Sequence, residues 1–294
     1  MNTKTKIAVA AFLSRIVRGA RGVFGKAGSG IFRRGGFNWE LDLTQGIDFA
    51  IFLQGGFEPG TLRDYRRNVR PGFTVLDIGA NIGAHTLPLA GLVGEGGRVI
   101  AFEPTDYAFK KLQRNLSLNP EIALRVQAVQ AMLVGTDNPD KPAAIPSSWS
   151  LKNEEGADVH PDHGGKFQPI LGAQAIRLDD WVSAAGLDQV SFIKLDVDGY
   201  EVGVLEGGAK TLSKWHPTMM MEFAPYIFAE RGRSFGEVLA ILRSLNYRCR
   251  TVSGRPVNLD ASLEAAIPHG ASMNVILEHP CPRKNRIQSP SFLF

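Results

Sequence analysis

The first group of residues able to do chemistry is a glycine-rich turn that follows a short apolar run. The turn contains Asp77, Gly79, Ala80, Asn81 and Gly83. Glycine lets the backbone turn sharply and approach a ligand closely, and a helix that begins near Gly83 directs its amides toward that ligand. Such a turn after the first strand of a doubly wound sheet indicates a nucleotide-like ligand. The Gly-x-x-x-Gly spacing differs from the Gly-x-Gly-x-x-Gly of dinucleotide-binding turns, which disfavours an NAD-dependent oxidoreductase.

An acidic residue lies where the second strand is predicted to end. Glu103 follows the run 98–102 and comes 20 residues after Gly83. A carboxylate at this place can accept hydrogen bonds from both hydroxyls of a ribose, and Pro104 lies next to it. His85 follows the glycine turn directly. It either contacts the ligand or makes a structural hydrogen bond at the helix start; we favour the second and keep His85 among the candidate ligand contacts.

A third group combines a lysine with two carboxylates. Lys194 and Asp196 share one face of the predicted strand 190–195, because side chains alternate along a strand. A lysine in a central strand is costly unless it is paired or lies near a cleft. Asp196 can position a substrate hydroxyl, act as a base or bind a divalent ion. Glu222 ends the predicted strand 218–223 and either pairs with Lys194 or joins Asp196 around a metal.

Lys194, Asp196 and Glu222 are therefore the candidate catalytic residues. No resident metal is predicted, although a divalent ion, if one binds, would use Asp196 and Glu222. Asp198 and Glu201 flank the start of the next predicted helix, where carboxylates serve as caps as readily as they serve chemistry.

Two histidines could form a second cluster. His160 and His163 are three residues apart, with Asp158 and Asp162 nearby. The group resembles a metal or base cluster, but a polar loop also produces such pairs by chance, and we favour chance.

These residues need a parallel sheet to position them. From residue 73 onward, short apolar runs of strand length alternate with segments of helical periodicity, which predicts right-handed βαβ units. The predicted strands are 73–78, 98–102, 123–129, 190–195, 218–223, 247–252 and 272–277, and the predicted helices between them are 84–93, 106–118, 201–212 and 235–245. The segment 135–170 is rich in Pro, Gly, Asp, Asn and Ser and is predicted to be a long insertion loop.

Four regions follow from this pattern. Residues 1–30 form a basic amphipathic arm, 31–71 a hairpin and helical extension broken near Gly55 and Pro59, 72–280 the main domain, and 281–294 an irregular tail. Every charged residue before Glu40 is basic. The arm is either a solvated helix on the domain, a peripheral contact with an anionic membrane or an arm for an acidic partner.

The bulk composition is that of a globular protein. Hydrophobic residues make up 44% of the 294 residues and charged residues 21%, and there are two cysteines. Two cysteines are too few for a disulfide framework, and no apolar run is long enough to span a membrane. A cytoplasmic location, with or without peripheral membrane attachment, is therefore predicted.

Six segments of the chain, in order, resemble the FkbM-type methyltransferases. They are 75–83, Phe102-Glu103-Pro104, Leu178-Asp179-Asp180, 193–201, 205–209 and 217–222, and the lead-in 46–58 is also similar. Asp198 stands where that family more often has glutamate, and His85-Thr86 where a small hydroxyl residue is common. The resemblance covers about residues 36–225.

The resemblance implies a class I methyltransferase fold, which is an α/β Rossmann-like sheet of seven mostly parallel strands flanked by helices. It also implies S-adenosyl-L-methionine as cofactor and O-methylation of a hydroxyl on a sugar, glycan, lipid-linked or polyketide-type acceptor. Divalent metal dependence stays open. No nucleic-acid partner is expected, because the chain has no Asn-Pro-Pro-Tyr sequence and no basic-aromatic groove pattern. The alternative is a non-catalytic cofactor-binding or scaffold protein at a membrane surface.

Overall fold

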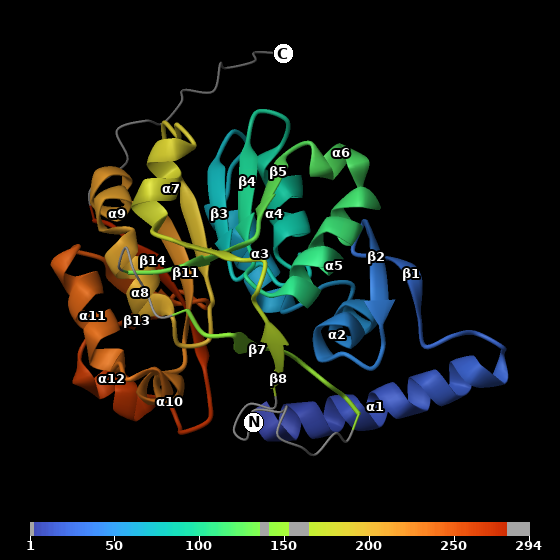
Figure 1. Ribbon diagram of the computed structural model, residues 1–294. Helices are drawn as coiled ribbons and strands as arrows, with labels where there is room; N and C mark the ends of the chain where they lie inside the picture. The colour runs from blue at the N-terminus through green and yellow to red at the C-terminus, as the bar shows by residue number, and fades with distance from the viewer. Residues whose placement is uncertain (1–2, 136–140, 153–164, 281–294) are drawn as a thin grey trace, which may run out of the picture.

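A computed structural model describes residues 3–135, 141–152 and 165–280. Its centre is an eight-stranded sheet in the order β13-β12-β14-β11-β10-β3-β4-β5 (Figure 1). The strands from β11 to β5 run parallel, whereas β14 is antiparallel to both β11 and β12, and β12 to β13. The bounds are β3 Thr74–Ile78, β4 Arg98–Phe102, β5 Val126–Val129, β10 Phe192–Leu195, β11 Thr218–Phe223, β12 Arg248–Thr251, β13 Pro256–Val257 and β14 Met273–Glu278. The predicted α/β fold with seven mostly parallel strands is confirmed, and β13 is a two-residue addition at one edge.

The chain reverses direction across the sheet beside β3. It builds β3, β4 and β5 outward and then returns to place β10 on the other side of β3. A crevice forms at such a switch point, outside the carboxyl ends of the strands, and this is where open α/β sheets bind ligands. The topology therefore brings the ends of β3, β4, β10 and β11 to one place.

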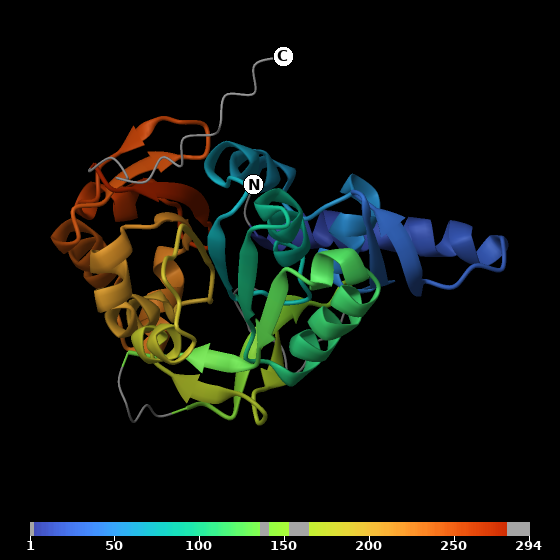
Figure 2. The ribbon, with the colours of Figure 1, turned by 90° about the horizontal axis from the view of Figure 1, so that it is seen from above.

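Helices cover both faces of the sheet, as seen from above in Figure 2. Alternation along each strand decides which residues face which layer: Leu76 packs with α7, α8, α9 and α11, whereas Val75 packs with α3 and α4. Both layers are formed by buried aliphatic and aromatic side chains. The bounds are α3 Pro59–Asn68, α4 Thr86–Val93, α5 Asp106–Ser117, α6 Pro120–Ala123, α7 Leu178–Ala184, α8 Glu201–Gly207, α9 Ala209–Trp215, α10 Pro225–Phe228, the 3-10 turn Ala229–Arg231, α11 Phe235–Ser244 and α12 Ala261–Ala266.

Two predicted elements are divided or shortened. The helix predicted over 201–212 is two helices, α8 and α9, which meet at Gly207 and Gly208. A Cβ on Gly207 would lie 2.1 Å from the carbonyl oxygen of Val134, so the close backbone approach there requires glycine. The strand predicted over 123–129 begins only at Val126, because residues 120–123 form α6.

The N-terminal region is a long helix followed by a hairpin and a second helix. These are α1 Thr3–Val23, the antiparallel pair β1 Ser29–Arg34 and β2 Phe37–Asp42, and α2 Gly46–Gln54. Ser14 anchors α1 by donating a hydrogen bond from Oγ to the Leu43 carbonyl oxygen at 2.5 Å. Among the described helices, none is both long and apolar enough to cross a membrane.

The insertion is partly regular, which corrects the prediction of a loop over 135–170. β7 Ala144–Trp149 and β8 Gly165–Pro169 form an antiparallel hairpin, and β6 Ala131–Leu133 pairs in parallel with β9 Gln174–Ile176 at its base. The polar composition concealed both pairs because their strands lack a clear apolar alternation. His160, His163, Asp158, Asp162 and the tail 281–294 lie outside the described residues.

Candidate active site

The glycine turn lies against the ends of β4 and β10. Gly79 has φ +82°, and a Cβ on it would lie 1.8 Å from the carbonyl oxygen of Asp196. The amides of Gly79 and Ala80 both donate to the carbonyl oxygen of Phe102, at 3.0 and 2.9 Å. Only glycine tolerates this combination of left-handed backbone and close approach. The turn is therefore held at a fixed position between two strands.

Gly83 has a packing role in this structure. It has φ +91°, and a Cβ there would lie 2.9 Å from Leu112 Cδ1 and 3.0 Å from Leu87 Cδ1. Gly83 thus allows α4 and α5 to pack closely and is not part of the cavity wall. Of the residues predicted to bind the cofactor, Gly79, Ala80, Asn81, His85, Glu103 and Pro104 do line the cavity.

Glu103 faces the turn and is fixed by three hydrogen bonds. Its Oε2 accepts from the amide of Asn81 at 2.8 Å, and its Oε1 accepts from Thr105 N at 2.9 Å and Thr105 Oγ1 at 2.5 Å. Burial raises the pKa of this carboxyl, and the hydrogen bonds from Thr105 and Asn81 oppose that rise. A carboxylate has about four acceptor positions, so Glu103 keeps one for a ribose hydroxyl. This arrangement fits a ribose-bearing cofactor through one hydroxyl, where the sequence suggested both.

Lys194 joins the turn to the carboxylates. Its Nζ donates to the Gly79 carbonyl oxygen at 2.7 Å and forms ion pairs with Asp77 at 3.6 Å and Asp196 at 3.4 Å. Burial opposes the charged form, but the carboxylates of Asp196 and Asp77 outweigh it and raise the pKa of Lys194. Asp77 is fully buried behind the lysine and accepts from Thr86 Oγ1 at 2.6 Å. Asp77 therefore supports the turn and Lys194 from the side that faces away from the cavity.

Asp196 and Glu222 are a hydrogen-bonded carboxyl pair. Asp196 follows β10 and its side chain is 35% exposed to the cavity. Burial opposes ionisation of Asp196, but Lys194 and hydrogen bonds from Glu222 and Lys194 lower its pKa. Burial and the charge of Asp196 raise the pKa of Glu222 well above its usual range. A hydrogen bond between two carboxyls requires one proton, and the raised pKa of Glu222 favours Glu222 as the donor and Asp196 as the acceptor. This contact favours pairing of Glu222 with Asp196 over an ion pair with Lys194.

Two further carboxyls lie in the same place. Asp198 has φ +49°, and burial followed by the charge of Asp196 raises its pKa to about 7. Glu58, which the sequence did not single out, accepts hydrogen bonds from Thr61 Oγ1 and Asn274 Nδ2, both at 2.9 Å. Burial, and then the charge of Asp196, raises the pKa of Glu58. The position of Glu58 just before a Pro-Gly helix start was its only local signal.

His85 is a buried neutral histidine. Its Nδ1 lies 3.1 Å from the hydroxyl oxygen of Tyr65, and its ring makes edge contacts with Tyr65 and Phe57. Burial lowers its pKa to about 3. These contacts favour the structural interpretation of His85, although the ring also forms part of the cavity wall.

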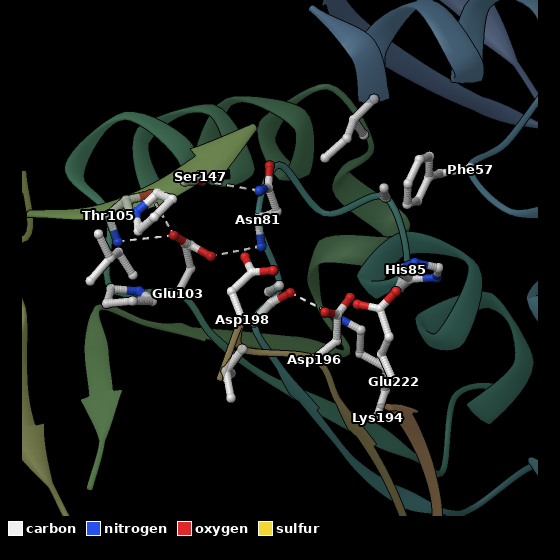
Figure 3. Close-up of a pocket in the computed structure, with 18 of the residues that line it drawn as sticks. Phe57, Asn81, His85, Glu103, Thr105, Ser147, Lys194, Asp196, Asp198 and Glu222 are labelled. Carbon is white, nitrogen blue, oxygen red and sulfur yellow. Dashed lines mark hydrogen bonds and ion pairs between the residues drawn. The ribbon is translucent and has the colours of Figure 1, made fainter. Parts of the chain in front are cut away.

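Two cavities share the carboxyls of Glu58, Asp198 and Glu222. Figure 3 shows residues that line the first of them. The first, of about 130 Å³, lies between the glycine turn, Glu103 and β7, where Asn81 Nδ2 donates to Ser147 Oγ at 3.2 Å. The second, of about 370 Å³, lies between α1, α2 and α10. Phe57, Glu58, Trp149, Asp198 and Glu222 line both. The first is smaller than the roughly 300 to 1,000 Å³ of most ligand pockets, because β7 lies over it.

The carboxylates also satisfy one geometric condition for a cation. Ligand atoms of Asp196, Asp198 and Glu222 all lie within 4.8 Å of one another. Lys194 supplies one positive charge to this region, which Asp77 and Asp196 share. The oxygen ligands of the three carboxyls suit a divalent cation.

Comparison with known proteins identifies the family of this chain. The family model described as "Methyltransferase FkbM domain" matches residues 77–249. A "2-O-methyltransferase NoeI" from Sinorhizobium fredii is 28% identical over 175 residues, which cover 55% of this chain and 70% of the relative.

Solved structures of methyltransferases are also similar. A methyltransferase FkbM from Methylobacillus flagellatus is 18% identical, with a TM-score of 0.41, over 74% of this chain and 50% of the other. An S-adenosylmethionine-dependent O-methyltransferase from Thermotoga maritima is 17% identical, with a TM-score of 0.42, over 90% and 83%. Scores this low add no weight, and the family match stands on the sequence.

Proposed function

The chain belongs to the FkbM methyltransferase family and is an S-adenosylmethionine-dependent methyltransferase, and from that premise we propose that it methylates a hydroxyl of a small-molecule, glycan, lipid-linked or polyketide-type acceptor. The observation that carries this proposal is Asp196, a carboxylate of the first cavity that lies beside Asp198 and Glu222, which line both cavities. The printed name of the relative NoeI, a 2-O-methyltransferase, supports transfer to oxygen.

The first cavity would hold the cofactor. The glycine turn, Glu103 and Pro104 form its wall, and the free acceptor position on Glu103 suits one ribose hydroxyl. When bound, S-adenosylmethionine supplies a methyl group attached to a positively charged sulfur, which is strongly electrophilic. The β7 hairpin over this cavity would limit the access of water to the reacting atoms.

The second cavity would bring the acceptor hydroxyl to Asp196. An ionised Asp196 accepts a hydrogen bond from that hydroxyl and so directs an oxygen lone pair toward the methyl carbon. The oxygen–carbon bond would form as the carbon–sulfur bond of the cofactor breaks, and the sulfur would leave with that electron pair as a neutral thioether. The methylated oxygen would become strongly acidic, and its proton would pass to Asp196. A carboxylate with a lowered pKa is sufficient for this late transfer. Lys194 and Glu222 act as positioning residues, since they keep Asp196 ionised and oriented.

The test is methyl transfer from isotopically labelled cofactor to a panel of sugars, glycans and lipid-linked glycans, with the labelled position determined by NMR. We expect the label in a methyl ether. Asp196→Asn should reduce turnover by about 10²- to 10⁴-fold, the usual contribution of a positioned acid or base, while calorimetry shows cofactor binding retained. Label on nitrogen or carbon, or near-normal turnover of Asp196→Asn, would exclude the proposed mechanism.

A further inference from the structure

The helix α1 has two apolar faces, and one of them is turned away from the protein. Its inner face packs on the hydrophobic cluster beneath it through Ile7, Ala10, Ala11 and Val17. On the opposite side lie Val9, Phe12, Leu13, Ile16 and Val23, which are 47%, 62%, 41%, 53% and 82% exposed. These five residues, called the outer stripe below, follow the spacing of one helical face. Figure 1 shows α1 along the edge of the molecule, with one side open.

An exposed apolar stripe is unusual on a helix whose other face already packs against the protein. Single exposed apolar residues are normal on protein surfaces, but a contiguous apolar patch marks an interaction site. The inner face already supplies the packing that holds α1 in place, together with the Ser14 hydrogen bond. None of the hydrophobic clusters formed by the described residues includes the outer stripe, so the packing described for this chain does not explain its composition.

The charge around the stripe identifies the partner. Every charged residue before Glu40 is basic, and Arg15 on α1 and Lys26 just after it are exposed. Phe24, which follows the helix directly, is 78% exposed. A helix with an apolar side, basic flanks and no acidic residue suits the surface of an anionic lipid bilayer, where the apolar side enters the acyl boundary and the cations meet the head groups.

We propose that α1 docks the protein on an anionic membrane through the outer stripe and the neighbouring basic residues. The helix would lie in the plane of the surface, as amphipathic helices at membrane interfaces do. A helix tied to the protein along its inner face presents the stripe without losing further conformational freedom on binding.

Docking would also place the second cavity beside the bilayer. Ile7 and Ala10, on the inner face of the same helix, line that cavity together with Asp198 and Glu222. An acceptor carried by a lipid could then reach the carboxylates without leaving the surface. This consequence rests on the proposed function, whereas the docking itself does not.

The experiment is co-sedimentation of the full chain with vesicles of phosphatidylcholine containing phosphatidylglycerol, and with vesicles of phosphatidylcholine alone. We expect binding to the anionic vesicles that weakens at high salt, and weak binding to the neutral ones. The double variant Phe12→Ser, Ile16→Ser should reduce the partition constant by at least about tenfold, given the apolar area it removes. Arg15→Glu should reduce it several-fold, by about the contribution of a basic residue near the surface.

Matched controls distinguish binding through the outer stripe from nonspecific hydrophobic and electrostatic binding. Leu124, which is 90% exposed elsewhere, is changed to Ser, and the exposed Lys110 is changed to Glu; both variants should bind like the wild type. Circular dichroism and cofactor calorimetry check that every variant is folded.

Absent vesicle binding, or binding that the α1 variants leave unchanged, would overturn the docking proposal. A dimer in light scattering that the Phe12→Ser, Ile16→Ser variant dissolves would overturn it as well, because a second copy of the chain would then cover the stripe. If the protein fails to bind vesicles but still transfers methyl groups, only the docking proposal is excluded. If the protein binds vesicles but transfers no methyl group, only the proposed acceptor chemistry is excluded.

Discussion

Glu201 makes the stability of this protein depend on pH in a way that one substitution can isolate. The residue is 3% exposed at the start of α8, and its Oε1 accepts a hydrogen bond from Val197 N at 3.2 Å. Its Oε2 has no hydrogen-bond partner among the described residues. Burial raises the pKa of this carboxyl from 4.5 to about 8, so folding favours the protonated form.

The direction of the effect follows from linkage. Because the folded-state pKa of Glu201 lies above the unfolded value, its stabilising contribution is complete below the unfolded pKa and disappears as the pH rises through about 8. At about pH 6 the folded carboxyl is still protonated, and at about pH 9 it is ionised. At about 1.4 kcal/mol per pH unit, its contribution to the free energy of unfolding falls by about 3 kcal/mol between these values. For a chain of this length, that corresponds to about 5 °C in Tm.

The assay is thermal unfolding of the wild type and Glu201→Gln at both pH values, followed by circular dichroism. Glutamine keeps an acceptor for Val197 N but does not ionise. We expect the Tm of the wild type to fall by about 5 °C more than that of the variant, because the other buried carboxyls are present in both proteins. Glu95→Gln, which changes an exposed carboxyl, should follow the wild type. Parallel Tm curves for Glu201→Gln and the wild type would refute the reasoning.

Three other predictions concern the site. Gly79→Ala should abolish cofactor binding in calorimetry, because the new Cβ would lie 1.8 Å from a backbone oxygen. The control Gly96→Ala, whose Cβ would have no atom within 4 Å, should bind the cofactor normally. Equal binding by both variants would contradict the role of the turn. Thr86→Val removes the 2.6 Å hydrogen bond to the buried Asp77 and should lower the free energy of unfolding by about 1 to 3 kcal/mol; an unchanged denaturant midpoint would count against it. Exhaustive chelation should change turnover by less than about twofold, because Lys194 already places a positive charge beside Asp196. A large loss that Mg²⁺ restores would instead assign a cation to Asp196, Asp198 and Glu222.

The sequence predicted best where local pattern and tertiary structure agree. The strands 98–102 and 218–223 were predicted with the bounds that the structure gives them, because apolar residues occupy 99–102 and 219–221 without interruption, as in a buried strand. Lys194 and Asp196 were singled out for the same reason, since a lysine within such a run has to be paired.

What escaped prediction depends on contacts between distant segments. Glu58 enters the site because it bonds to Asn274, 216 residues later in the chain. The choice of Asp196 as the partner of Glu222 depends on how β10 and β11 are aligned, which periodicity does not specify. The β7 hairpin has no alternation of its own and takes its place from Trp149, which packs close to Gly46 and lies 6.0 Å from Phe57, ring centre to ring centre.

The parallel pair of β6 and β9 has a consequence for how such a protein can diversify. The pair joins the two ends of the insertion outside the main sheet, with Ala131 opposite Gln174 and Leu133 opposite Ile176. What lies between these ends can change in length at little cost, about 0.6 kcal/mol for each doubling of a closed loop, and leaves the register of the eight-stranded sheet untouched. We expect the segment between the two strands to tolerate replacement, which would alter what covers the cavity while Lys194 and Asp196 keep their places.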